Sequence, residues 1–169
     1  YDWLVKELRD EEGIDWKIVV MHKGLYTLGE HTNDVEVKGL RSQLTPLLYD
    51  MGVDLVLQGH DHTFTTTKFL DRNGNPVDNS NASITTSEFS YDTPNGVLYA
   101  TMGTIADKFY KYNENSGFAI DETHSITNTL DSATYCYFTV DGKQLQINYR
   151  SFNAVENAKL KAKPITIAK

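Results

Sequence analysis

Two short apolar runs that each end in histidine constrain this sequence more than any other feature. The run at 53–57 leads to His60 and His62, and the run at 16–21 leads to His22. Both runs are short, rich in branched residues and largely uninterrupted, which is typical of buried strands in an α/β sheet. A helical pattern lies between them, so we expect a βαβ unit whose parallel strands bring their carboxyl ends together.

These three histidines predict a metal site. Ligand sites in open α/β sheets gather just beyond the carboxyl ends of the strands. Neutral imidazole binds zinc, iron, nickel and copper, and Gly59 permits the tight turn in which two imidazoles can converge. Alternatively, the histidines only make hydrogen bonds within loops, and their spacing leaves both interpretations open.

Composition limits the class of protein. The chain has 169 residues and a formal net charge of −7, which favours one globular domain and argues against a nucleic-acid partner. The single cysteine, Cys136, excludes an internal disulfide, and we expect a buried thiol. No apolar run is long enough to span a bilayer, so we expect no membrane partner.

The amino-terminal part reads as helix, strand, loop, helix and strand. An amphipathic helix is expected over 1–12, and a polar loop with His31 over 23–34. A second helix should begin after Asn33 or Asp34 and run to about Met51. Because Pro46 lies inside it, we expect a kink or a division into two helices.

The remainder of the chain reads as mostly β. We expect a hairpin over 133–149, with Asp141-Gly142 as its two-residue turn and one buried face on both arms. The other expected features are a strand at 64–70, a turn at 71–76, a surface loop at 78–96, a strand at 97–102, an irregular segment at 105–130 and a short strand at 165–167.

Three blocks carry a resemblance to a known family. Val19–Tyr26 resembles the VxxHxPxY block of calcineurin-like metallophosphoesterases, and Gly59–His62 resembles their GHxH block. Val97–Thr104, followed by Lys108–Tyr110, is similar to a further segment of the purple-acid-phosphatase-like branch. The resemblance extends from residue 1 to about residue 150.

The resemblance implies a fold and a reaction. Residues 1–150 would be the carboxy-terminal half of a four-layer α/β/β/α sandwich, with a mixed sheet and a C-terminal β-hairpin, and 151–169 an extended tail with a short strand. Two metal ions, drawn from iron, zinc and manganese, would activate a hydroxide that attacks the phosphorus of a phosphate ester. We expect an extracellular or cell-envelope location for the longer protein.

It also implies roles for four histidines. By resemblance, His22 and His60 would ligate the second metal and His62 the first. His31, nine residues after His22, matches a histidine that contacts phosphate or protonates the leaving group.

The sequence also departs from the family pattern. Gly24 replaces the proline after the ligand histidine, and Phe64-Thr65-Thr66 replaces the usual Tyr-Glu-Arg. The family's amino-terminal blocks, DxH or DxG, GDxx[DY] and GNH[DE], which supply the remaining ligands, are absent. We therefore expect this chain to be inactive alone, and to pair with the amino-terminal half of the domain or to self-associate.

Two alternatives remain open at this stage. One is a binding or structural module without enzymatic activity. The other is a mononuclear zinc hydrolase in which Asp61 or Glu30 is the general base.

Overall fold

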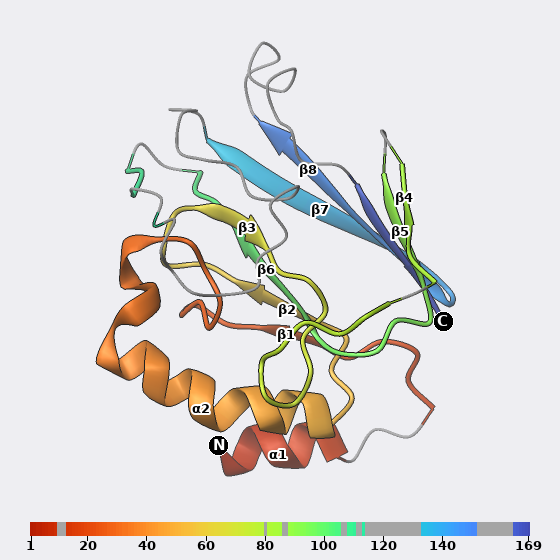
Figure 1. Cartoon of the computed structure of the whole chain (residues 1–169), viewed down its shortest axis with the longest axis horizontal. Helices are drawn as coiled ribbons and strands as arrows, with labels where there is room; N and C mark the ends of the chain where they lie inside the picture. The colour runs from red at the N-terminus through yellow and green to blue at the C-terminus, as the bar shows by residue number, and fades with distance from the viewer. Residues whose placement is uncertain are drawn as a thin grey trace.

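The computed structural model contains two β-sheets stacked face to face, with helices against the outer face of the first sheet (Figure 1). It describes residues 1–9, 13–79, 81–85, 88–105, 108–110, 113, 133–151 and 164–169. None of the helices in these ranges is long and apolar enough to cross a membrane.

The first sheet has the strand order β1-β2-β6-β3. Strands β1, β2 and β6 run parallel, and β3 is antiparallel to β6. Helix α2 connects β1 to β2, which confirms the predicted βαβ unit. The bounds are β1 Ile18–Val20, β2 Leu55–Gln58, β3 Phe64–Thr66, β6 Leu98–Met102 and α2 Val35–Asp50.

Helix α2 continues through Pro46, so the predicted division into two helices is wrong. Proline removes the hydrogen bond that its N–H would donate to the carbonyl of residue 42. The two residues that follow, Leu47 and Leu48, are both buried. Their burial offsets the lost hydrogen bond. The other helical segments are α1 Asp2–Arg9 and the short 3₁₀ helix η1 Glu30–Asn33.

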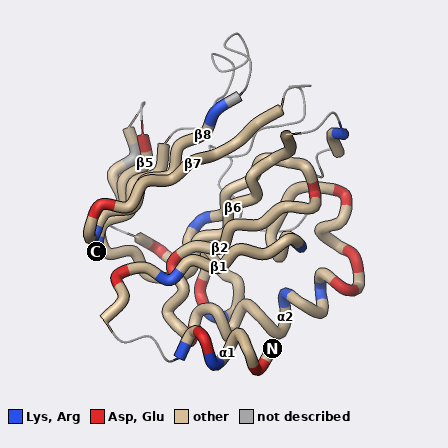
Figure 2. Tube along the Cα trace, turned by 180° about the vertical axis from the view of Figure 1, so that it is seen from behind, with Lys and Arg blue, Asp and Glu red and all other residues tan. Residues whose placement is uncertain are grey.

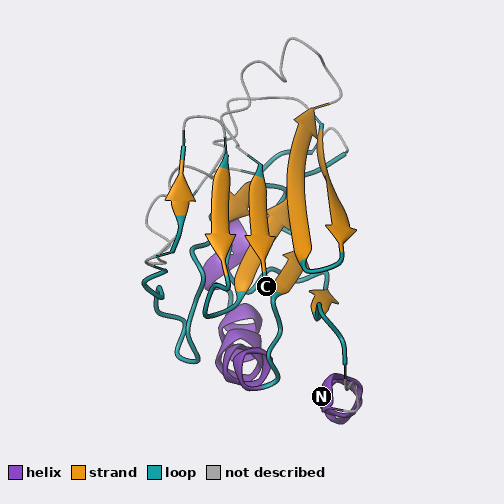
Figure 3. Cartoon of the chain, turned by 90° about the vertical axis from the view of Figure 1, so that its right-hand side faces the viewer, coloured by secondary structure: helices purple, strands orange, loops and turns teal. Residues whose placement is uncertain are grey.

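The second sheet has the strand order β4-β5-β9-β8-β7. The short strand predicted near the carboxyl end is β9, which lies between β5 and β8 in the middle of this sheet (Figure 3). The bounds are β4 Ser83–Ile84, β5 Phe89–Asp92, β7 Thr134–Asp141, β8 Gln144–Ser151 and β9 Ile165–Ala168.

The predicted surface loop over 78–96 is partly wrong, because it contains β4 and β5. Phe89 and Tyr91 alternate along β5 and are both buried. The many Asn, Ser, Thr and Asp residues around them conceal this alternation in the sequence. The predicted irregular segment at 105–130 lies almost entirely outside the described residues.

The predicted hairpin is present, but its details differ from expectation. Asp141 pairs with Gln144, so the two turn residues are Gly142 and Lys143 rather than Asp141 and Gly142. Gly142 has a φ of +53°, which glycine adopts without steric cost. Only β8 buries a full face, and most of β7 is exposed, so the expectation of a buried face on both arms is wrong. Cys136 on β7 is only partly buried.

Two hydrophobic cores flank the first sheet. Leu55 and Leu57 of β2 pack between the sheets, whereas Val56 faces Leu48 of α2. This alternation gives β2 two buried faces, as expected for a central strand of an α/β sheet. Figure 2 shows the charged residues of α1 and α2 on the outer side of the molecule. The α/β class, the mixed sheet and the hairpin are confirmed, and the described residues supply a helix layer and both sheets.

Candidate metal centre

The candidate site begins where β1 and β2 end. The backbone N–H of Met21 donates to the carbonyl of Leu57 at 3.0 Å, and the N–H of Gly59 donates to the carbonyl of His22 at 3.1 Å. These bonds continue the strand pairing beyond both strands. They hold Met21 and His22, which follow β1, beside the turn that follows β2. His22 therefore lies next to His60.

The imidazoles of His22 and His60 meet edge to face, with an angle of 82° between the ring planes. Nε2 of His22 lies 3.1 Å from Nδ1 of His60, and the ring centroids are 5.0 Å apart. The backbone φ is +72° at His60 and +49° at His62, a region that residues other than glycine rarely adopt. Such backbone conformations cluster at functional sites, where the surrounding structure maintains them.

His31 reaches the same cluster from η1. Its ring centroid lies 4.7 Å from that of His60. Its Nδ1 lies 2.9 Å from Oδ2 of Asp34, so this carboxylate accepts a hydrogen bond from the ring and fixes its orientation. The structure therefore brings His31 into contact with His60.

Asp61 anchors the loop that carries His31. Its side chain is buried and accepts hydrogen bonds from the hydroxyl of Thr27 and, at 3.2 Å, from the backbone N–H of His31. Donor atoms of His31, His60 and Asp61 all lie within 4.8 Å of one another. Both carboxylate oxygens accept protein hydrogen bonds, so Asp61 anchors the loop that carries His31. Its engagement weakens the alternative in which it is the base of a mononuclear zinc enzyme.

The same loop explains why glycine replaces the family's proline at position 24. A Cβ atom on Gly24 would lie 2.2 Å from Cγ2 of Thr27, which is fully buried. The space beside residue 24 is therefore filled by the side chain that donates to Asp61. The glycine at position 24 and the anchoring of the loop thus both depend on the buried side chain of Thr27.

Gln58, at the end of β2, is a second anchor that the sequence did not reveal as part of the site. Its side-chain oxygen accepts from the N–H of Leu25 at 2.8 Å, and its amide nitrogen donates to the carbonyl of Tyr26. This buried amide fixes the segment that follows His22. A polar residue at the end of an apolar strand is the only signal in the sequence.

His62 is placed by a different set of contacts. Its Nδ1 lies 2.6 Å from the carbonyl of Lys108, so Nδ1 carries the proton and Nε2 keeps the lone pair that a metal requires. The ring centroid of Tyr110 lies 4.8 Å from that of His62 and 5.2 Å from that of His31. Tyr110 therefore contacts both histidines and links His62 to the cluster.

The environment of His60 disfavours the charged form of its ring. Burial lowers the pKa of His60 below its usual value, and the nearby charges of Lys23 and His31 lower it further. A neutral imidazole has a lone pair available for a metal.

The donor set suits a metal that prefers nitrogen ligands. Two nitrogens on a tetrahedral zinc are separated by roughly 3.3 Å, given zinc–nitrogen bonds of about 2.0–2.1 Å. The distance of 3.1 Å between His22 and His60 is close to this value. Their imidazoles thus fit a shared cation that completes its coordination with further ligands.

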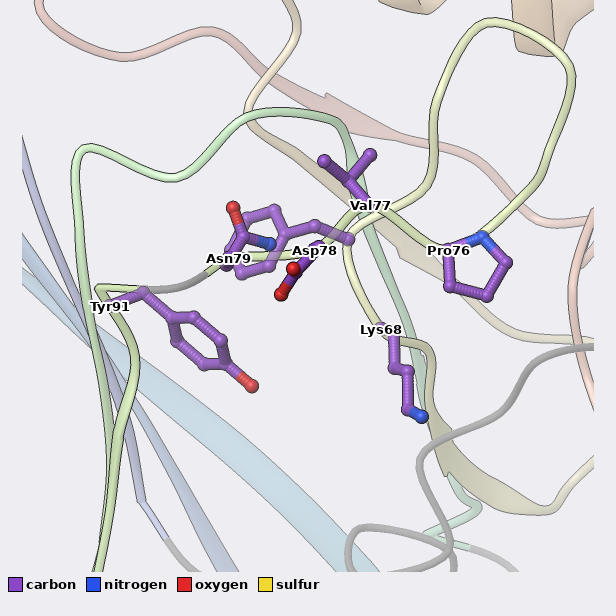
Figure 4. A pocket seen from close by; sticks show the side chains of 7 residues that line it. Lys68, Pro76, Val77, Asp78, Asn79 and Tyr91 are labelled. Carbon is purple, nitrogen blue, oxygen red and sulfur yellow. The ribbon is translucent and has the colours of Figure 1, made fainter.

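Among the hollows that lie away from the histidines are two beside the sheets. One, of about 370 Å³, lies beside Tyr91 and has Lys68 and Asp78 in its lining (Figure 4). The other, of about 470 Å³, is mostly apolar and lies between β1 and the two α-helices. Neither is lined by a histidine.

Comparisons with known proteins agree with this geometry. Residues 1–64 match the family model of calcineurin-like phosphoesterases. Purple acid phosphatase 21 of Arabidopsis thaliana is 33% identical over 105 residues, covering 61% of this chain and 20% of the relative. An uncharacterized protein of Mycobacterium tuberculosis strain H37Rv is 30% identical over 107 residues, covering 61% of this chain and 18% of the relative.

A solved structure shares the fold. The purple acid phosphatase PPD1 from yellow lupin seeds superposes with a TM-score of 0.68 at 18% identity, covering 99% of this chain and 28% of that chain. The chain spans about a fifth of the length of the Arabidopsis and Mycobacterium relatives. The chain is thus similar to calcineurin-like phosphoesterases over residues 1–64 and to a purple acid phosphatase over 61% of its length.

Proposed function

We propose that these residues form part of a metal-dependent hydrolase of phosphate esters. The observation that carries the proposal is the pair of neighbouring imidazoles, His22 and His60, at the carboxyl ends of two parallel strands. Ligands of a catalytic metal belong at this position in an α/β sheet. The relationship to purple acid phosphatases supports a phosphate ester as the substrate.

In this proposal each histidine has a defined role. His22 and His60 hold one metal and His62 holds a second, with iron, zinc or manganese as the candidates. Bound metals would supply an activated hydroxide and stabilise negative charge on the phosphoryl group. His31, oriented by Asp34, contacts the phosphate or donates a proton to the leaving alcohol.

Metal binding tests the ligand assignment. Calorimetric titration with zinc should show binding that His60→Ala weakens at least tenfold, because the cation loses one of its two neighbouring imidazoles. The control is His124→Ala, which removes a histidine to which we assign no ligand role. Equal zinc affinity in the wild type and His60→Ala would reject the assignment.

We further propose that this chain does not hydrolyse phosphate esters efficiently by itself. Its three candidate ligands leave two metals under-coordinated, and the remaining ligands would come from the family's amino-terminal blocks on a partner segment. An assay with p-nitrophenyl phosphate and added manganese, zinc or iron should therefore give little turnover. Robust metal-dependent turnover, lost in His60→Ala, would show that the chain is sufficient.

A further inference from the structure

Lys23 brings a positive charge to the histidine cluster. Its Nζ lies 3.1 Å from Nε2 of His60 and forms an ion pair with Glu36. The side chain of Glu36 is 62% exposed, whereas that of Lys23 is 30% exposed. The cation is thus partly sheltered at the site, while the carboxylate that balances it is largely in solvent.

The contact between Lys23 and His60 fixes the tautomer of the ring. An ammonium group only donates hydrogen bonds, so Nε2 of His60 must be the acceptor. Nδ1 of His60 then carries the ring proton and donates a hydrogen bond to Nε2 of His22, 3.1 Å away. The three side chains form a chain of hydrogen bonds that suits the metal-free site.

Binding of a metal by both His22 and His60 would change this arrangement. If Nδ1 of His60 gives its lone pair to the metal, the ring proton must move to Nε2. Nε2 and the ammonium of Lys23 would then both be donors, and their hydrogen bond would be lost. Lys23 would then keep the exposed carboxylate of Glu36 as its counter-charge among the described residues.

We propose that Lys23 binds an oxygen of the phosphate group of the substrate when the metal is in place. The inference rests on the proposed function. Lysine binds phosphate as a point charge, and a phosphate would replace Glu36, which lies in the first turn of α2. The positive end of that 16-residue helix also favours a negative charge at this place. The VxxHxPxY block specifies no residue type at the position of Lys23, so the phosphate-binding role of Lys23 rests on its contacts with His60 and Glu36.

Inorganic phosphate is the probe for this inference. The chain is loaded with zinc, freed of unbound metal by gel filtration and titrated with phosphate in a calorimeter. Lys23→Gln should weaken phosphate binding about tenfold, the value of one charge-assisted hydrogen bond. Glu36→Gln should strengthen binding, because it removes the competing carboxylate. Lys38→Gln, which removes an exposed lysine of the same helix, is the control and should change nothing.

A second measurement follows the histidine itself. Long-range ¹⁵N–¹H spectra should show an unprotonated Nε2 at His60 in the metal-free chain and a protonated Nε2 after zinc is added. Wild-type phosphate affinity in Lys23→Gln, or no phosphate binding by the zinc-loaded wild type, would overturn the inference. The proposed metal site would survive either result if zinc binding still depended on His60. Loss of that dependence would overturn both proposals.

Discussion

Asp61 shows how a single buried residue can position its neighbours in the candidate site. It sits between His60 and His62, yet its side chain turns inward and holds Thr27 and the backbone of His31. Gly29 packs directly against it, since a Cβ on Gly29 would lie 2.4 Å from Cβ of Asp61. The position of His31 therefore depends on the residue between the two histidines of the GHxH block.

Asp61→Asn should destabilise the protein by about 1–3 kcal/mol. The new amide group places an N–H donor where the carboxylate accepted from Thr27 or His31. The free energy of unfolding in urea measures the loss. Glu30→Gln, an exposed carboxyl in the same loop, is the matched control and should change the free energy of unfolding by less than about 0.5 kcal/mol. Similar values for the two variants would show that Asp61 is no anchor.

Asp71 provides a pH-dependent test at the turn predicted over 71–76. The hydrogen bond from the backbone N–H of Asn75, helped by that of Asn73, holds the pKa of Asp71 below its ordinary value, although desolvation acts against them. A carboxyl with a lowered pKa stabilises the fold above its unfolded pKa of about 3.9. That contribution is lost as the pH falls through the lower, folded value.

Asp71→Ala should therefore lower the free energy of unfolding by about 1 kcal/mol near neutral pH. The difference from wild type should shrink as the pH falls below about 4. Urea unfolding across this range measures it, with the exposed Asp78→Ala as the control. A difference that grows toward acid pH would contradict the argument.

Among the elements, β5 and β9 are more important than their sequences suggest. The two strands are parallel, with Phe89 opposite Ile165 and Tyr91 opposite Ile167. All four side chains are buried in the core between the sheets. A segment that reads as a surface loop and one that reads as part of a tail thus supply the middle of the second sheet.

Ile165→Ala should cost about 2–5 kcal/mol of stability, because it leaves a cavity in this core. Val140→Ala, on the exposed edge strand β7, should cost less than about 0.5 kcal/mol. Urea unfolding compares the two variants. If both changes were small, β9 would not be an integral strand.

At the scale of the whole molecule, the edge of the first sheet is open. β1 is the outermost strand of that sheet, and within the described residues no strand pairs with its free side. Val20 on this edge is 76% exposed, and Trp3 beside the apolar hollow is 71% exposed. An open, apolar strand edge favours pairing with another strand.

The chain should therefore self-associate as its concentration rises. Val20→Lys should reduce this association, because a lysine on an edge strand opposes edge-to-edge pairing. Light scattering over a range of concentrations measures the effect, and Val35→Lys, at an exposed valine outside the sheets, is the control. A monomer at high concentration would contradict the prediction. An added segment that carries the family's amino-terminal blocks should compete with self-association.

The sequence by itself determined the features whose signals are local. Two apolar strands that end in histidine, the helix between them and the hairpin each depend on residues close together in the chain, and the structure contains all of them. The meeting of His22 with His60 also followed from the sequence, because parallel strands joined by a helix align their carboxyl ends. The division of the chain near residue 150 stays a prediction.

Only the tertiary structure decided the rest. The approach of His31 to His60 depends on Asp61, thirty positions away from the N–H that it accepts. The burial of β5 depends on β9, more than seventy positions further along the chain. Neither relation leaves a periodic pattern in the sequence. Each joins residues that are far apart in the chain, and the space and hydrogen-bond donors around them exist only in the folded protein.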